Sequence, residues 1–321
     1  MHSLREIMRT LRTSPGFALA VLVTLGIGGL VGVMVVLMQL QPGFLGMAHG
    51  TDPHHRTHDL AYGFLFTTAV VGMLAQLRRP SKNVAGMLMA LVPWVGLLLA
   101  AVLSTDAGVI RSAERLLVAL GIVSAALLHP AGRDFFRSFA VSRVNWGMLG
   151  LVIIAAVPLL DFASTNIGLQ GTVRDDHAAL GHYGFMAAFG FTVIGAGLLA
   201  SVRPDGWRLT AWVAGLLPAF LGLTSVMYPD ASSSLDPVWA LVAIAWGAVF
   251  VAAATARSRT LLAVGTSSPA ADQRKRPRPR ARRRAGPAHR AAHRAHRRTR
   301  PRQEHNTLPA LLHFADRPSP S

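Results

Sequence analysis

Hydrophobic residues fall in long runs along this chain, and short polar segments separate the runs. The runs are about 18–24 residues long, which is the length that an α-helix needs to cross the hydrocarbon core of a bilayer. We therefore predict an all-α integral membrane protein with about eight transmembrane helices. The predicted spans are 17–40, 60–77, 84–104, 107–129, 146–163, 178–201, 207–228 and 237–256.

Two of these spans have basic or polar neighbours that affect their interpretation. The first span follows a basic cytoplasmic segment, residues 1–16. Because this span is too long for the apolar region of a signal peptide, we predict a retained helix. The fourth span has Arg111, Glu114 and Arg115 in its first turns. Their side chains are expected to reach the membrane interface or to pair there.

Lysine and arginine gather in every second polar segment, whereas the segments between them hold most of the acidic residues. Cytoplasmic loops carry an excess of basic residues, so this alternation predicts eight helices with both termini in the cytoplasm. We expect the lipid bilayer of a cytoplasmic membrane to surround the helices. The basic groups are Arg5/Arg9/Arg12, Arg78/Arg79/Lys82, Arg133/Arg137/Arg143, Arg203/Arg208 and Arg257/Arg259.

The loops that enter the second and sixth spans resemble each other. One reads GTDPHHRTHDLAYGF from Gly50 and the other reads GTVRDDHAALGHYGF from Gly171, an offset of 121 residues. After the next helix the offset is 125 residues, and it aligns Pro93 with Pro218. Both prolines are predicted to kink equivalent helices. The pattern indicates two parallel four-helix repeats, and chance similarity between apolar segments is the alternative.

The repeats define the domain organisation that we predict. A first four-helix repeat covers residues 17–129, a cytoplasmic linker covers 130–145, and a second repeat covers 146–256. Parallel repeats would bring the two histidine-bearing loops together on the outer side, near a pseudo-twofold axis. Transporters with parallel repeats place their sites at such an interface.

Histidine and aspartate are concentrated in these two outer loops. His54 and His58 are four residues apart, which places them on one face of a helix, as in a pair that binds a divalent metal. A carboxylate from the other repeat could complete a Zn²⁺ site, and a solvated loop whose histidines cap helices is the alternative. The cluster comprises His54, His55, His58, Asp59, Asp175, Asp176, His177 and His182, of which His54, His58, His177, His182 and Asp176 are the predicted metal ligands.

His182 is the histidine that we place deepest, about one turn into the sixth helix. We expect His58 and His182 to approach each other across the repeat axis. A histidine at such a depth is most often structural, but a proton or substrate role and axial ligation of haem stay open. Haem in a helical bundle usually needs two axial ligands on facing helices, and His58 is the candidate partner of His182.

Composition narrows the chemistry that the chain can perform. The 321 residues contain no cysteine, which excludes disulfides, thiolate metal sites and cysteine nucleophiles. Charged residues make up 15% of the chain, compared with roughly 25% in an average soluble domain. The sequence has no phosphate-binding loop and no Ser-His-Asp order, so it does not identify an enzyme.

The net charge of +17 belongs mostly to residues 257–321, which we predict to be a disordered Arg-rich cytoplasmic tail. The tail could bind anionic lipid headgroups on the membrane surface. It could also follow a frameshift in a GC-rich gene and have no selected role. Nucleic acid is the least favoured partner, because no aromatic residues are interleaved in the basic segment to stack on bases.

Two segments resemble known families. The N-terminus of macrolide-exporter-type ABC permeases resembles residues 3–28, which read SLREIMRTLRTSPGFALAVLVTLGIG. This resemblance covers less than a tenth of the chain and does not bring the activity with it. The loop motifs at 51–58 and 175–182 are similar in style to those of bacterial multi-pass membrane families of unknown function, which implies a membrane location and little else.

We expect a multi-pass membrane protein that carries a small solute or an ion. The repeat, the paired prolines and the outer polar loops favour transport. Almost no ionisable residue is predicted at mid-membrane depth, however, where coupled carriers usually have one. Two alternatives are a membrane redox protein with a histidine-bound metal or haem, and a non-catalytic scaffold or accessory subunit. Neither a carrier nor a scaffold requires a resident cofactor, and the oligomeric state is left open.

Overall fold

The structure is a computed structural model that describes residues 8–9, 12–41, 55–132, 137, 139 and 143–266. Among these residues, every element of regular secondary structure is a helix, as predicted. Seven helices are long and apolar enough to cross a membrane, which supports a multi-pass membrane protein. The long helices are α2 (Pro15–Val35, continued by a π-helical turn at Val36–Leu40), α4 (Arg56–Leu74), α5 (Val84–Leu103), α6 (Ala113–Leu127), α7 (Trp146–Thr172), α9 (His182–Val202), α10 (Trp207–Met227) and α11 (Pro237–Thr266).

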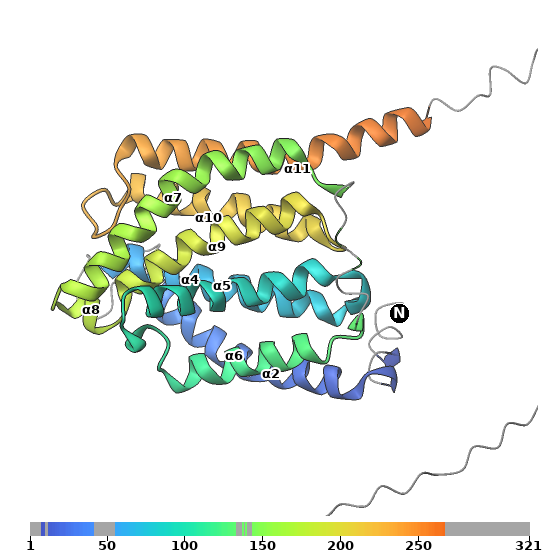
Figure 1. Cartoon of the computed structure of the whole chain (residues 1–321), viewed down its shortest axis with the longest axis horizontal. Coiled ribbons are helices and arrows are strands. Elements are labelled where there is room, and N and C mark those ends of the chain that lie inside the picture. The colour runs from blue at the N-terminus through green and yellow to red at the C-terminus, as the bar shows by residue number, and fades with distance from the viewer. Residues whose placement is uncertain are drawn as a thin grey trace, which may run out of the picture. The chain divides into compact units, whose positions relative to one another are not determined.

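Four helices form the interior of the bundle and the others cover it (Figure 1). The apolar stretches of α4, α5, α9 and α10 are half or more buried, whereas those of α2, α7 and α11 are at most about a quarter buried. Helix α2 packs with α6 on one side, and α7 lies beside α11 on the other (Figure 1). In each predicted repeat, the first and fourth helices (α2 and α6, α7 and α11) therefore lie on the outside, and the second and third lie in the interior. The repeat itself stays a prediction.

The outward faces of the covering helices are apolar. Ile154 and Val157 on α7 are 70% and 73% exposed, and Leu120 on α6 is 63% exposed. Soluble proteins rarely expose contiguous apolar patches of this kind, because water is a poor solvent for them. In hydrocarbon the same side chains are well solvated, so the exposed belt agrees with a bilayer as the surroundings.

Helix α6 is shorter than the predicted span 107–129. Residues Ala107–Val109 form a separate 3₁₀ turn, η6, in which the Asp106 carboxylate accepts a hydrogen bond from the backbone N–H of Gly108 at 2.8 Å. Arg115 donates to the carbonyl of Val109 at 2.9 Å and so ties the turn to the start of α6. The remaining helix has 15 residues, about 22 Å, compared with a hydrocarbon core of about 30 Å. The prediction of one continuous span here was wrong.

Helix α7 is longer than the predicted span 146–163 and ends only at Thr172. The polar residues after 163 suggested a loop, but two of them are buried and hydrogen bonded within the fold. The amide of Asn166 donates to the carbonyl of Phe162 at 2.9 Å, and Gln170 bonds three neighbours. Because these amide groups donate hydrogen bonds within the fold, the polar residues do not end the helix.

Two further helix ends differ from the prediction. Helix α9 begins at His182 rather than at 178, because Gly181 has a φ of 79° and interrupts the helical path after Ala179. Helix α11 continues to Thr266, ten residues into the predicted tail. The rest of the tail, residues 267–321, lies outside the described residues, so the prediction of disorder there is not tested.

Arg79 and Arg203 occupy matching backbone positions in the two halves. Each has a positive φ, 56° and 55°, and each directly precedes a proline. A left-handed conformation is uncommon for a residue other than glycine. The offset of 125 residues that aligns Pro93 with Pro218 pairs Arg203 with Arg78, so the backbone match differs from the sequence alignment by one residue.

Pro93 and Pro218 both lie inside continuous helices, α5 and α10. Each proline lacks an N–H, so the carbonyl four residues earlier, at Met89 and at Ala214, loses its helical donor. Both prolines are buried, and both belong to the central helices of the bundle. The predicted kinks at these positions stay a prediction.

Replacing Gly247 with alanine is expected to destabilise the packing of α10 against α11. A Cβ atom at Gly247 would overlap the backbone carbonyl oxygen of Gly215, which cannot move without shifting a helix. Small residues at helix contacts allow such close approach in membranes, and overpacking costs about 1–3 kcal/mol. Unfolding in mixed micelles measures this loss. Gly150→Ala is the matched control, because nothing lies within 4 Å of its added Cβ. Equal loss in both variants would contradict the close contact.

The stability of the bundle is expected to fall as the pH drops from 6.5 towards 4, through His129. This side chain follows α6, is 5% exposed and packs edge to face on Phe17 at 5.3 Å. Its Nδ1 accepts from the N–H of Ala131 at 3.2 Å, so Nε2 carries the proton and donates to Gln76 Oε1 at 3.3 Å. Burial lowers the pKa of His129 from 6.5 to about 4, and a hydrogen bond to Pro80 opposes this only partly.

The sign follows from comparing the folded and unfolded chains. The unfolded chain takes up the proton near pH 6.5, whereas folded His129 takes it up only near pH 4. Stability from neutral His129 is therefore complete above pH 6.5 and declines by about 3 kcal/mol on the way to pH 4. His129→Gln retains a donor for Gln76 and cannot titrate. Parallel pH profiles of unfolding for the wild type and this variant would show that His129 is not the group responsible.

Candidate metal centre

Four histidines meet at one end of the bundle. His55 precedes α4 and His58 lies in its first turn. His177 belongs to the single-turn helix α8 (Asp176–Ala179), and His182 is the first residue of α9. Figure 1 shows α8 at the opposite end of the bundle from the start of α2. Each predicted repeat thus contributes two histidines to the cluster.

The four imidazole rings form two stacked pairs that contact each other edge to face. The rings of His55 and His177 have centroids 4.3 Å apart and planes inclined by 21°. The rings of His58 and His182 have centroids 5.2 Å apart and planes inclined by 24°. Between the pairs, His55 lies 4.8 Å from His182, and His58 lies 4.9 Å from His177. Rings at these distances bring several nitrogen atoms into one small volume.

Three of the histidines have nitrogen atoms close enough to share a metal ion. One ring nitrogen from each of His55, His177 and His182 lies within 4.8 Å of the other two. Zinc–nitrogen bonds are about 2.0–2.1 Å long, which places the nitrogens of a tetrahedral site about 3.3 Å apart. The donors that are farthest apart would have to approach by about 1.5 Å to reach this spacing.

His58 is fully buried, and one of its nitrogens has no hydrogen-bond partner. Its Nε2 lies 2.9 Å from the hydroxyl of Ser233, while its Nδ1 is buried without a partner. If Nε2 carries the proton and donates to Ser233, the lone pair of Nδ1 is available to a ligand. A histidine that binds a metal usually donates its other N–H to a neighbour in this way.

His177 has a similar arrangement with Asp175. Its Nε2 is buried without a hydrogen-bond partner, and its Nδ1 lies 3.8 Å from Asp175 Oδ2. This distance exceeds that of a hydrogen bond, but it means that the Nδ1 side of the imidazole is the side next to the carboxylate. Nε2 is then the nitrogen of His177 that can bind a metal. Asp175 supplies a negative charge next to the cluster.

Asp175 is held by the start of α8 and by Tyr183. The backbone N–H of Ala178 donates to Oδ1 at 2.8 Å, and the Tyr183 hydroxyl donates to Oδ2 at 2.9 Å. The Ala178 hydrogen bond is the largest cause that lowers the pKa of Asp175; burial opposes it, and the Tyr183 hydrogen bond and the charge of His177 lower the pKa further. The carboxylate is therefore ionised around neutral pH and can balance the charge of a bound cation.

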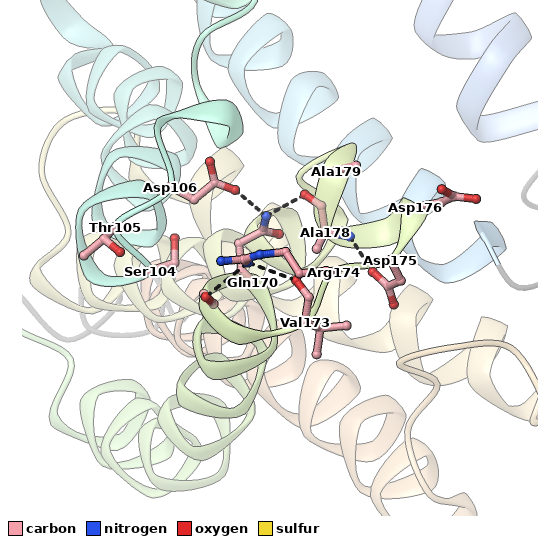
Figure 2. Close-up of a pocket in the computed structure, with 11 residues that line it drawn as sticks. Ser104, Thr105, Asp106, Gln170, Val173, Arg174, Asp175, Asp176, Ala178 and Ala179 are labelled. Atoms are coloured by element: carbon pink, nitrogen blue, oxygen red, sulfur yellow. Dashed lines mark hydrogen bonds between the residues drawn. The ribbon is translucent and has the colours of Figure 1, made fainter.

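Gln170 on α7 holds the elements that carry these residues. Its amide nitrogen donates to Asp106 Oδ2 at 2.6 Å and to the carbonyl of Ala178 at 2.7 Å, as Figure 2 shows. Its oxygen accepts from the N–H of Gly184 at 3.0 Å. One buried side chain thus connects η6, α8 and α9. Because these hydrogen bonds are all to the protein, we assign Gln170 a positioning role and do not include it among the candidate ligands.

A polar cavity of about 550 Å³ lies beside the cluster. Its wall includes Asp106, Gln170, Arg174 and Asp175, whose side chains surround it in Figure 2. Asp175 therefore contacts His177 on one side and the cavity on the other. The residues that line the cavity include none of the four histidines, so Asp175 is the described residue that links the cavity to the cluster.

Two arginines near the site lie over aromatic rings. The guanidinium of Arg56 lies 4.3 Å from the ring centre of Tyr228. That of Arg115 lies 4.7 Å from the ring centre of Phe185. Such cation–π contacts stabilise a positive charge on an aromatic face. They also keep these two charges in fixed places rather than among the imidazoles.

The predicted ligand set is only partly retained. His58 and His182 lie together as expected, and His177 joins them. His54 lies outside the described residues, so its role is not tested, while His55 occupies the cluster. The structure does not bring Asp176 to the histidines: it is exposed as the first residue of α8 and points away from the other side chains in Figure 2.

The sequence contained signals for the two residues that the predicted ligand set omitted. His55 and His58 are three residues apart, and a spacing of three also places side chains on one helical face. Asp175 precedes a short helix, where an aspartate commonly accepts from the N–H three residues later. This capping turns the Asp175 carboxylate back over the helix and turns Asp176 outwards, which explains why the first and not the second faces His177.

The comparisons with known proteins identify no family. No family model and no curated protein matches this chain, and no solved structure matches it. The fold and the site are therefore the basis for any function. They define a multi-pass helical membrane protein with a cluster of four histidines at one end of the bundle.

Proposed function

We propose that this chain is a membrane protein that binds one divalent transition-metal ion through His55, His177 and His182, with His58 as a fourth ligand. The observation that carries the proposal is the convergence of these four imidazoles from two distant segments. Buried polar atoms normally have hydrogen-bond partners. The nitrogens His58 Nδ1 and His177 Nε2 have none, and a metal ion would satisfy both.

Zinc is the ion that this donor set suits best. Imidazole nitrogen is a good ligand for Zn²⁺, Cu²⁺ and Ni²⁺, and a four-coordinate arrangement of nitrogens favours zinc. Haem suits the site less well. The rings of His58 and His182 are stacked face to face with centroids 5.2 Å apart, which leaves no space between them for a macrocycle. The bound metal would supply a Lewis acid next to the polar cavity.

The site is proposed to face the outside of a cytoplasmic membrane. The start of α2 and the end of α11 lie at the same end of the bundle, opposite the histidines (Figure 1). That end carries the basic loops, including Arg78, Arg79 and Lys82, which the positive-inside rule assigns to the cytoplasm. The parallel repeat is part of the proposal, because it explains why α4 and α9 bring equivalent loops together.

A resident metal centre is favoured over an ion carrier by what lies beneath the histidines. The next layer of the bundle is a core cluster of apolar and aromatic side chains that includes Phe64, Phe189 and Leu217. An ion that entered at the histidines would meet these apolar side chains, and burying an unpaired charge is expensive. A carrier would need to open this layer.

The polar cavity favours a second candidate within the same class, a metal-dependent enzyme. A catalytic zinc site keeps one position open for water or substrate, and three histidines form such a site. The cavity of about 550 Å³ beside Asp175 has room for a small polar molecule. In this case His58 would not be a ligand, and three histidines would hold the ion.

Metal analysis of the purified full chain tests the proposal. The protein is purified in detergent without chelators or a histidine tag, and its metal content is compared with that of a His58→Ala/His182→Ala double variant. We expect close to one zinc equivalent per wild-type chain, or binding of one added equivalent, and loss of both in the variant. A visible spectrum from the same samples tests haem. Absence of stoichiometric metal in the wild type, before and after zinc addition, would refute the proposal.

A further inference from the structure

The end of the bundle away from the histidines carries a second cavity, and its chemistry is different. It has a volume of about 410 Å³ and is lined by Arg137, Arg143, Ser81, Val84 and Asp205 among others. Arg143 donates to Asp205 Oδ1 at 2.8 Å, and both side chains are partly exposed. Two guanidinium groups and one carboxylate leave this cavity with a net positive charge.

An apolar groove of about 600 Å³ lies between α5 and α9. Every residue that lines it is apolar, from Leu88 to Leu99 on α5 and from Phe191 to Val202 on α9. Several of these side chains are open to the surroundings, with Val95 at 54% exposure and Leu198 at 42%. In a membrane, hydrocarbon is the medium that would fill such a groove.

The groove and the basic cavity form one continuous surface. Val84 lines the cavity and Leu88, one helical turn further along α5, lines the groove. Phe139 lines the groove, whereas Arg137 and Arg143 on either side of it in the sequence line the cavity. The positive charge therefore lies at one end of the apolar channel.

The length of the groove matches one leaflet of a bilayer. From Leu88 to Leu99 the α5 backbone rises by about 17 Å, at 1.5 Å per residue. Half of a hydrocarbon core is about 15 Å thick. An acyl chain in the groove would thus begin at the basic cavity and end near the middle of the membrane.

We propose that this surface binds one anionic phospholipid, with its phosphate at Arg137 and Arg143 and one acyl chain in the α5–α9 groove. Arginine binds phosphate oxygens through its fork of N–H donors. The Arg143 guanidinium has five N–H donors, and its pairing with Asp205 is made through Nη2. Basic pockets between transmembrane helices are known to hold anionic headgroups. A second copy of the chain would fit less well, because it would have to supply an acidic group at the cytoplasmic end of an apolar helix face.

Retention of lipids by the full chain tests this proposal. The protein is incorporated into nanodiscs of dioleoyl phosphatidylglycerol and dioleoyl phosphatidylcholine in equal amounts and then released into detergent. The lipids that stay bound are counted by native mass spectrometry. We expect one retained phosphatidylglycerol, favoured over phosphatidylcholine by about fivefold to thirtyfold, since each basic residue near the surface contributes about a factor of five.

Three variants distinguish headgroup from chain binding. Arg137→Gln alone and combined with Arg143→Gln should remove the headgroup preference in steps, while Arg78→Gln, an exposed arginine at the same end, should leave it unchanged. Leu198→Trp should fill the groove and reduce retention of both lipids. Equal retention of the two lipids by the wild type would overturn the proposal. So would an Arg78→Gln effect as large as that of Arg137→Gln, or a wild-type dimer that Leu198→Trp converts to monomers. The site is independent of the metal centre, so either proposal can fail without the other.

Discussion

Replacing His182 with alanine is expected to lower the affinity of the purified protein for Zn²⁺ by at least about a hundredfold. A structural zinc site with four ligands contributes about 10–16 kcal/mol of binding free energy, so one ligand accounts for roughly 3 kcal/mol. His182 contacts two of the other rings, His55 at 4.8 Å and His58 at 5.2 Å.

Competition with a chromophoric chelator measures this affinity in detergent. His129→Gln is the matched control, because it also removes a buried histidine, one that bonds to Gln76 rather than to the cluster. The control should bind zinc as the wild type does. The ligand role of His182 would be disproved by an affinity that stays within a factor of about three while the variant remains folded.

The second large effect is expected at Asp175. Replacing it with asparagine should weaken zinc binding by about ten- to a hundredfold, as is usual when a group that orients a metal-binding histidine is removed. The carboxylate lies 3.8 Å from His177 Nδ1 and is fixed by the N–H of Ala178 and the hydroxyl of Tyr183. Asparagine retains much of the shape and removes the charge.

Asp176 provides a control one residue away. It has the same charge and is also exposed, but its side chain points away from the site (Figure 2). Asp176→Asn should leave the zinc affinity unchanged. If the two asparagine variants weakened binding equally, the effect would come from the general acidity of the loop, and the specific contact of Asp175 with His177 would have no role.

The sequence predicted most of the membrane architecture because apolar length is a strong signal. Seven of the eight predicted spans correspond to helices long and apolar enough to cross a bilayer. The errors fall where local hydrogen bonds decide the ends of helices. Gln170 and Asn166 allow α7 to continue through a polar stretch, and Gly181 delays the start of α9. Such contacts depend on neighbours that a linear sequence does not display.

The candidate site was only partly predictable for a related reason. The repeat of the two loops was sufficient to expect that His58 and His182 would approach each other. Which carboxylate joins them depends on the capping turn at Asp175, which directs one of two adjacent aspartates inwards. The contact between His58 and Ser233 could not be anticipated, because Ser233 comes from the loop after α10 and is brought in only by tertiary packing.

The central claim is that four imidazoles from two segments of the chain bind one metal ion. X-ray absorption at the zinc edge, on protein loaded with one equivalent, measures the ligand shell directly. The account predicts three or four nitrogen ligands at about 2.0–2.1 Å, with the outer-shell scattering of imidazole rings. A shell made of oxygen atoms, or one that contains a single imidazole, would contradict this claim. The histidines would then be structural residues and not metal ligands.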